Sequence, residues 1–218
     1  MLSISGFYIN ILFDEMRLAG NEILKFQDVT FFGNQHFSLA DLPEEIRENI
    51  FDLGEFRKIK NQQNVVDIGE YCTEIFWVIN GAFVCQYFEE ELAIERTINF
   101  HIDSFHSFMT SVESYFYNTK SKYKLKAVRQ SEVIVFKRSA VNELIENNSF
   151  INQLCFAGLT SALTSEIKLR SKLTILPADK FYSYLITNYP QIIQQIPSKY
   201  IAEFMGITQE WLSKLKRR

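Results

Sequence analysis

The chain has 218 residues, of which 47% are hydrophobic and 22% are charged, so it can form one large domain or two small ones with a core. Glycine and proline number only 8 and 4, which excludes collagen-like, linker-dominated and disordered classes. No apolar run approaches the roughly 18 residues of a membrane helix, and no basic region precedes the apolar segment 7–13. We therefore expect a cytoplasmic protein with no membrane contact.

The formal net charge of −3 is unevenly distributed along the chain. Residues 1–159 carry 14 Lys and Arg against 22 Asp and Glu, a net charge of −8, whereas residues 160–218 carry 9 against 4, a net charge of +5. The last five residues alone, 214–218, hold four positive charges. A basic C-terminal segment on an acidic body favours contact with a polyanion, and a solvated, frayed tail is the alternative.

The residue types that build metal centres and enzyme sites are few and scattered. The three cysteines, Cys72, Cys85 and Cys155, form no C-x-x-C pair, so a disulfide framework, a zinc finger and an iron–sulfur cluster are not expected. The three histidines, including His101 and His106, contain no His-x-His pair of the kind that a cupin metal centre uses. No G-x-S-x-G, P-loop or H-E-x-x-H motif occurs. We expect no metal, no cofactor and no enzymatic activity.

The first elements of the chain are helical by prediction. Residues 1–36 have weak periodicity and are interpreted as a helical, amphipathic lead-in. Residues 41–53 predict a firmer helix, because Asp41 can cap it, Pro43 suits its first turn, and apolar residues recur every four positions from Leu42.

Between residues 56 and 137 the pattern changes to short β-rich runs separated by turn residues. Six such runs in about 80 residues are typical of an antiparallel sandwich or barrel, often called a β-roll. The Asn80-Gly81 pair between two apolar runs predicts a tight hairpin. The expected strands cover residues 64–68, 75–79, 82–88, 97–101, 123–128 and 133–136.

From residue 139 onward the period becomes helical, so the fold class is α+β. We expect a short helix at 139–146, a long helix at 150–173, a helix at 178–188 and a short turn at 191–196. The long helix has an apolar stripe at alternating spacings of four and three, which predicts a coiled-coil-like dimer seam. Packing on its own sheet is the alternative. The stripe consists of Cys155, Leu159, Ala162, Leu169 and Leu173, with Glu166 among them.

The terminal segment 198–215 predicts a helix-turn-helix. Ser198 can cap its first helix and Thr208 its second, and Gly206 lies where the sharp turn needs a residue that tolerates positive φ. Ala202, four residues before Gly206, is small enough for the helices to cross closely. The inner face of the pair is apolar: Ile201, Met205, Ile207, Leu212 and Leu215.

This geometry assigns candidate DNA contacts. On the outer face of the second helix, four side chains are expected to read bases in the major groove: Gln209, Glu210, Ser213 and Lys214. Five others are better placed to meet phosphates, which set the register but carry no sequence information: Lys199, Thr208, Lys216, Arg217 and Arg218. A helical hairpin that packs on another protein is the alternative.

The order of roll, long helix and helix-turn-helix resembles the CRP/FNR family of bacterial transcription regulators, and most of all its Bacteroidetes-type members. The resemblance covers roughly residues 37–218 and rests on segments 66–70, 76–81, 108–115, 196–202 and 206–208. It implies a cyclic-nucleotide-binding-like roll (37–148), a dimerisation helix (149–175) and a helix-turn-helix DNA-binding domain (176–218) after an N-terminal extension (1–36). A homodimer on a palindromic DNA site is implied as well, and RNA polymerase is a candidate further partner.

The effector position departs from the family pattern. Cyclic-AMP-binding members carry a Gly-Glu pair and an Arg-Ser pair in the roll, and the register places Thr110-Ser111 and Ser121-Lys122 there. Without the acid and the arginine fork we expect no tight cyclic AMP binding, and the effector stays unidentified. The interior can instead be filled by the roll's own side chains: Phe76, Phe83, Phe88 and Phe100.

The leading interpretation is a sequence-specific DNA-binding transcription regulator that acts as a homodimer. A β-roll module that binds a small molecule or a protein, and whose helix-turn-helix does not meet DNA, is the alternative.

Overall fold

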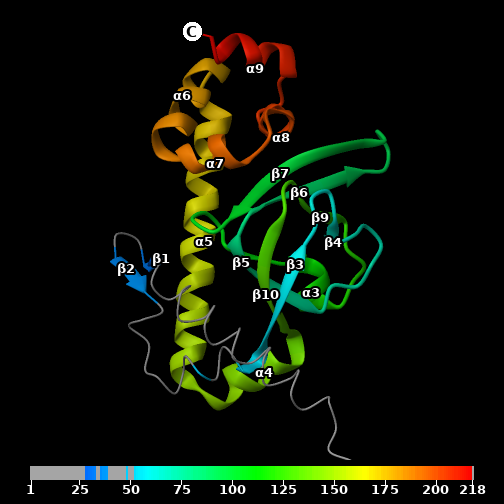
Figure 1. Ribbon diagram of the computed structural model, residues 1–218, viewed down its shortest axis with the longest axis vertical. Helices are drawn as coiled ribbons and strands as arrows, with labels where there is room; N and C mark the ends of the chain where they lie inside the picture. Colours follow the sequence, from blue (N-terminus) through cyan, green and yellow to red (C-terminus); the bar gives the residue numbers. More distant parts are fainter. Residues whose placement is uncertain (1–27, 33–34, 39–47, 49–51, 218) are drawn as a thin grey trace, which may run out of the picture.

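The computed structural model describes residues 28–32, 35–38, 48 and 52–217. Figure 1 shows a β-roll beside one long helix, with a group of short C-terminal helices around the upper end of that helix. The strands are β1 (Asp28–Phe32), β2 (Gln35–Ser38), β3 (Gly54–Ile59), β4 (Asn64–Val66), β5 (Glu74–Asn80), β6 (Ala82–Glu89), β7 (Ile94–Ile102), β8 (Phe108–Met109), β9 (Tyr123–Ala127) and β10 (Ser131–Lys137). The helices are α3 (Val112–Tyr117), α4 (Arg138–Asn147), α5 (Ser149–Ile175), α6 (Ala178–Asn188), α7 (Pro190–Gln195), α8 (Ser198–Phe204) and α9 (Gln209–Leu215).

Two four-stranded sheets form the roll. Their strand orders are β3-β10-β5-β8 and β4-β9-β6-β7, and neighbouring strands are antiparallel throughout. Strand β9 shows how the sequence encodes this arrangement: Leu125 and Ala127 are fully buried between the sheets, while Lys124 and Lys126 alternate with them and take the outer face. The antiparallel roll and the α+β class are confirmed.

The prediction of a hairpin at Asn80-Gly81 is wrong, because the two strands that flank this turn do not pair with each other. Strands β5 and β6 flank Gly81 but belong to different sheets, so the turn carries the chain from one sheet to the other. Gly81 has φ +103°, which only glycine adopts readily, and the N–H of Ala82 donates to Ser131 Oγ at 3.1 Å. The turn residues were recognised correctly, but the same backbone conformation serves here as a corner of the roll.

Replacing Gly81 by alanine should lower the free energy of unfolding by about 2–4 kcal/mol, because left-handed strain adds to overpacking. A Cβ at this position would lie 2.6 Å from Ser131 Cα and 2.5 Å from Ser131 Cβ. Urea denaturation measures the change. Gly69→Ala is the matched control: Gly69 has φ +83° with no atom within 4 Å of its Cβ position, so only the strain of about 1–2 kcal/mol remains. Equal losses in the two variants would contradict the close contact.

One helix of the roll was missed because its sequence suits a strand. Helix α3 carries valine and three aromatic residues in six positions, and it ends at Asn118 in the left-handed conformation at φ +54°. Packing selects the helix: Tyr115 is buried, and the guanidinium of Arg138 donates to its carbonyl at 2.7 Å. Strand β3, at the edge of its sheet, was also not separately predicted.

The aromatic filling of the roll is only partly as expected. Phe76 and Phe83 lie in the core between the sheets. Phe100 is fully buried but lies on the outer face of its sheet, against the C-terminal helices, and Phe88 is only half-buried. The side of the sheet that Phe100 takes follows from its strand pairing. Phe100 pairs with Val84, whose side chain lies on the outer face, and directly paired residues share one face.

The predicted helical lead-in over 1–36 is wrong for the residues that the structure describes. Residues 28–32 and 35–38 form the antiparallel hairpin β1–β2, which lies beside α5 in Figure 1. The run Val-Thr-Phe-Phe and the two-residue Gly-Asn connection favour a hairpin over a helix. Most of the predicted helix 41–53 lies outside the residues that the structure describes. The described residues of this range are Glu48, Asp52 and Leu53, and all three are helical.

The long helix α5 is confirmed and slightly longer than predicted. Asn148 caps it, because its side-chain oxygen accepts from the N–H groups of Phe150 and Ile151 at 3.1 Å each. The first turns of α5 and helix α4 cover the outer face of β5 and β10, where Trp77 and Ile134 form a separate apolar cluster with Ile151.

The predicted seam of α5 is wrong in its orientation. Leu169 is fully buried and Leu173 half-buried in the core shared with the C-terminal helices, and Cys155 packs on the cluster under α4. Leu159 and Ala162 of the predicted seam are exposed. Leu159 belongs to an exposed apolar stripe that also includes Phe156 (71% exposed), Leu163 (60%) and Ile167 (57%). A helix with apolar residues on two faces allows either assignment from spacing alone, and the chain itself covers the C-terminal part of the predicted face.

Four short helices complete the chain. Residues 190–195 form helix α7 rather than the predicted turn, because Pro190 is favourable in the first helical turn and Ile192 is fully buried. A second core joins these helices to Leu169 of α5 and to the outer face of β6 and β7. The C-terminal unit is therefore packed against the roll as well as against the long helix.

Candidate nucleic-acid interface

Helices α8 and α9 form the expected pair, and local chemistry sets the turn between them. Gly206 has φ +66°, the N–H of Ile207 donates to the carbonyl of Ala202 at 3.0 Å, and the N–H of Gly206 donates to that of Glu203 at 3.1 Å. This is the Schellman arrangement, in which a left-handed residue ends a helix. Ala202 and Leu212 are buried between the helices. Thr208 caps α9 by accepting from the N–H of Trp211 at 3.1 Å.

The cap predicted for α8 is wrong. Pro197 is the residue before the helix, and Ser198 is its first residue, without a capping hydrogen bond. The Ser198 hydroxyl instead accepts from the ammonium of Lys216 at the end of α9. Because proline presets φ near the helical value, the chain can begin the helix directly after it.

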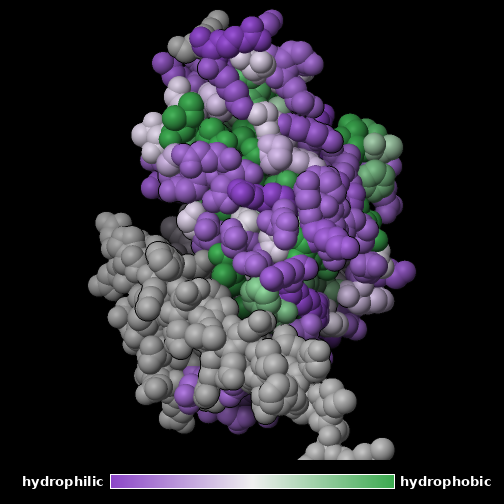
Figure 2. All heavy atoms as spheres, in the orientation of Figure 1, coloured by the Kyte–Doolittle hydropathy of each residue, from purple (hydrophilic) through white to green (hydrophobic). Residues whose placement is uncertain are grey.

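The outer face of α9 carries the side chains assigned to base reading. Gln209, Glu210 and Lys214 are exposed, and Ser213 is half-buried and accepts from the guanidinium of Arg217 at 3.3 Å. Hydrogen bonds from its own backbone N–H and from Thr208 lower the pKa of Glu210, so its carboxylate is ionised and is an acceptor at neutral pH. Hydrophilic side chains predominate at this upper end of the molecule (Figure 2).

Trp211 was missed by the sequence reasoning. It follows Glu210 on α9 and leaves half of its surface, 50%, exposed. A large exposed aromatic residue beside polar groups that can read bases is available for contact with a thymine methyl or with a sugar. Its neighbour Leu212 is fully buried. The position of Trp211 next to this inward-facing leucine on a short helix was the sequence feature that could have identified Trp211 as an outward-facing residue.

The residues assigned to phosphate contact lie around the two helix ends. Lys199 is 3.9 Å from the carboxylate of Glu203, and its ammonium lies 5.5 Å from the centre of the Tyr200 ring. Thr208, Lys216 and Arg217 are exposed on or beside α9, and Arg218 lies outside the described residues. The structure thus places Lys216 and Lys199 close to the same end of α8, through the contact with Ser198.

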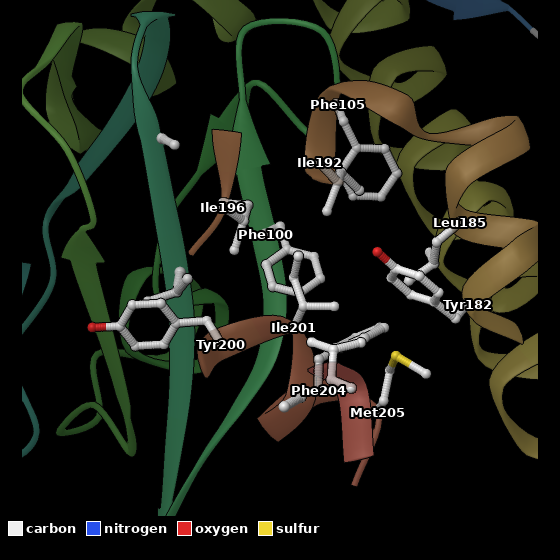
Figure 3. Close-up of a cluster of buried hydrophobic side chains, with 14 of the residues drawn as sticks. Phe100, Phe105, Tyr182, Leu185, Ile192, Ile196, Tyr200, Ile201, Phe204 and Met205 are labelled. Atoms are coloured by element: carbon white, nitrogen blue, oxygen red, sulfur yellow. The ribbon is translucent and has the colours of Figure 1, made fainter. Parts of the chain in front are cut away.

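Helix α8 is bound to the roll by an apolar and a polar contact. The rings of Phe204 and Phe100 lie 4.8 Å apart, and Figure 3 shows Phe100 facing Ile201 and Phe204 from the sheet. Glu203 accepts from the hydroxyl of Thr97 at 2.7 Å and from the amide of Gln86 at 3.4 Å. These contacts orient the helix-turn-helix relative to β6 and β7.

Three of the four residues assigned to an effector pocket form hydrogen bonds within the roll. The hydroxyls of Ser111 and Ser121 lie 2.7 Å apart and are almost fully buried, and Thr110 donates to the carbonyl of Glu74 at 2.8 Å. Lys122 is exposed. The nearby cavity, lined by residues from Val65 to Phe76, has a volume of only about 70 Å³, whereas pockets for small ligands have roughly 300–1,000 Å³.

Metal and membrane features are limited in the part of the chain that the structure describes. No group of three or more His, Cys, Asp or Glu side chains there is arranged to hold a metal ion. The three cysteines are free thiols, and burial raises the pKa of the Cys85 thiol to about 12. Among the same residues, no helix combines the length and the apolarity needed to cross a bilayer.

Comparison with known proteins relates the fold to solved structures. Neither a family model nor a curated protein sequence matches the chain. FixK2 from Bradyrhizobium japonicum superposes with a TM-score of 0.62 at 12% identity, over 75% of this chain and 83% of that one. CLP from Xanthomonas campestris, named a c-di-GMP responsive global regulator, gives 0.61 at 14% identity, over 80% and 90%.

A third structure comes from Eubacterium rectale and is assigned to the Crp/Fnr family of transcriptional regulators. It has a TM-score of 0.61 at 14% identity, over 82% of this chain and 83% of that one. The Xanthomonas campestris and Eubacterium rectale proteins are both described as regulators. The sequence resemblance and the structural likeness agree: this chain has the fold of the CRP/FNR transcription regulators.

Proposed function

We propose that the protein is a sequence-specific DNA-binding transcription regulator of the CRP/FNR type that acts as a homodimer. Residues 37–148 form its sensor domain, 149–175 its dimerisation helix and 176–218 its DNA-binding domain, with 1–36 as an N-terminal extension. The observation that carries the proposal is the exposed polar face of α9 on a helix pair with an intact turn and cap. A palindromic site is expected, because a two-fold dimer presents two copies of α9 about one duplex turn, roughly 34 Å, apart.

The exposed stripe on α5 supports the dimer. Four large apolar side chains follow one another along the helix from Phe156 to Ile167, and each leaves more than half of its surface exposed. A matching stripe on a second copy would remove this apolar surface from water, which is the main favourable term in such association. Random-site selection tests the function as a whole. Failure to enrich any sequence would favour a module whose helix-turn-helix does not bind DNA.

Lys214→Ala should weaken binding to a selected site by about 1–3 kcal/mol if the ammonium donates to a base, and binding to unrelated duplexes should change less. Fluorescence anisotropy at fixed salt measures both affinities. Lys58→Ala is the control, because Lys58 is exposed on β3, which belongs to the other sheet from β7, the strand on which α8 packs. Equal losses for selected and unrelated duplexes would reassign Lys214 to phosphate contact.

Cyclic AMP at about 100 µM should not raise the melting temperature measurably. The cavity of about 70 Å³ is too small for a nucleotide, and neither Ser121 nor Lys122 offers the bidentate fork of an arginine. Differential scanning fluorimetry checks this, because a ligand at 100 times its Kd would stabilise the fold by about 2.7 kcal/mol. A rise of several degrees would show that the roll opens to admit the nucleotide.

A further inference from the structure

Strand β7 is irregular at Ile98, where the strand meets the docked helix-turn-helix. Thr97 pairs with Gln86 and Asn99 pairs with Cys85, which are consecutive residues of β6, so Ile98 has no partner on that strand. Such a β-bulge adds one residue to a strand and shifts the alternation of the side chains that follow it. The bulge therefore changes which side chains of β7 face α8.

The bulge brings Thr97 and Phe100 to the same face of the sheet. Residues three positions apart lie on opposite faces of a regular strand. Here the hydroxyl of Thr97 donates to Glu203 of α8 at 2.7 Å, and the rings of Phe100 and Phe204 lie 4.8 Å apart. The extra residue at Ile98 thus allows β7 to hold α8 by a polar and an apolar contact together.

The backbone of the bulge also binds α5, through the guanidinium of Arg170. Its Nη2 donates to the carbonyl of Ile98, and its Nε donates to the carboxylate of Glu166 at 2.6 Å. The Cζ atom lies 5.1 Å from the centre of the Phe204 ring, within the range of a cation–π contact. A planar guanidinium can make all three contacts, because its donors lie along its edge and its face stays available to a ring. One side chain of α5 therefore contacts both the bulged strand and the first helix of the helix-turn-helix.

Arg170 lies next to the apolar stripe on which the proposed dimer depends. Ile167 is the last residue of that stripe and lies three positions before Arg170, so the two side chains are neighbours on the surface of α5. Both line an open groove that extends along the helix to Ile175, and 39% of the Arg170 side chain is exposed. A second copy that covers the stripe would also reach this groove. Arg170 is thus placed between the proposed dimer surface and α8.

We propose that the contacts of Arg170 with the Ile98 bulge and with Phe204 fix the orientation of the helix-turn-helix on α5, and so determine the half-site spacing that the dimer recognises. This assignment of Arg170 as a positioning residue rests on the proposed function as a DNA-binding homodimer. Spacing depends on orientation, because one base pair more or less moves a half-site by about 3.4 Å along the duplex and turns it by about 35°. A side chain that only stabilised the fold would change the affinity for every spacing alike.

The test measures affinity for palindromic duplexes that share the selected half-sites but differ by one or two base pairs in spacing. For the wild type we expect the best spacing to bind roughly tenfold more tightly in fluorescence anisotropy than spacings one base pair away. Arg170→Met retains the apolar stem but loses the charge and the donors, and it should reduce this ratio to about threefold or less. Its affinity for a single half-site, and its mass in analytical ultracentrifugation, should equal those of the wild type.

Two further variants complete the test. Lys168→Met is the matched control, because it removes one positive charge from an exposed position of the same helix and should retain the wild-type ratio. Phe204→Leu removes the ring beside the guanidinium and should lower the ratio as Arg170→Met does, with no further loss when the two changes are combined. Circular dichroism confirms that each variant is folded, and Phe204→Leu carries the test if Arg170→Met is not.

Several results would overturn the role of Arg170 and leave the proposed function intact. They are a wild-type protein that binds all spacings equally, a folded Arg170→Met dimer with the wild-type ratio, and losses for Arg170→Met and Phe204→Leu that add in the double variant. A monomeric Arg170→Met protein would also overturn it, because Arg170 would then hold the dimer together. Failure of the folded wild type to bind any of these duplexes would contradict the proposed function itself.

Discussion

Leu163→Glu together with Ile167→Glu should convert the protein to a monomer and weaken binding to a palindromic site by about 10²- to 10⁴-fold. Both side chains are more than half exposed on the apolar stripe of α5, and two glutamates there would place charge in the interface of the proposed dimer. The loss in DNA affinity follows because a dimer binds the second half-site as an intramolecular event, whereas a monomer does not. Analytical ultracentrifugation measures the mass, and fluorescence anisotropy measures the affinity.

Lys168→Glu is the matched control for this variant. It changes the net charge by the same two units and lies on α5 next to Ile167, but its exposed side chain lies off the apolar stripe. It should leave the protein dimeric. A wild-type protein that is already monomeric, or a double variant that remains a dimer with unchanged affinity, would contradict the proposed use of this stripe.

The elements that depend on local sequence were predictable. The turn of the helix-turn-helix needs one residue with positive φ and one cap, and Gly206 and Thr208 provide both within three positions. Strand alternation on β9 likewise distinguishes Leu125 and Ala127 from the lysines between and beside them. In the first case the interactions that select the conformation join residues only a few positions apart, and in the second the alternation itself is visible in the sequence.

The arrangement of elements in space was not predictable in the same way. Glu203 meets Thr97 and Gln86, which are 106 and 117 residues away in the sequence. No periodicity in a single sequence records such a pairing, and the same holds for the burial of Leu169. Apolar residues on two faces of α5 predict that both faces are buried. Which of the two packs against strands of the same chain depends on how the roll folds.

The candidate effector site shows a related limit. The alignment of Thr110-Ser111 and Ser121-Lys122 with the family pattern identified residues that do come together, since the hydroxyls of Ser111 and Ser121 are in contact. It could not show how closely these hydroxyls pack, or that the cavity lined by residues from Val65 to Phe76 has a volume of about 70 Å³. Volume is a property of packing, so it required the structure.

Lowering the pH from near 7 to near 5 should reduce the free energy of unfolding by about 2 kcal/mol for each of two buried histidines. Burial lowers the pKa of His101 and of His106 from an ordinary value of 6.5 to about 4. Between these values the unfolded chain binds a proton and the folded chain does not, so stability is lost as the pH falls. Chemical denaturation at the two pH values measures the difference.

The surroundings of the two rings make this result informative. His106 has its Nδ1 4.0 Å from the Glu166 carboxylate, which also accepts from Arg170 at 2.6 Å, and the Nδ1 of His101 lies 2.8 Å from the carbonyl of His106. If desolvation dominates, His101→Gln should reduce the pH dependence by about half, because glutamine retains a donor but does not titrate. Should Glu166 dominate, the imidazolium of His106 would be stabilised instead, and stability would hold or increase toward pH 5. Because these residues join the roll to α5, such an increase would show that protonation strengthens the contact between the two.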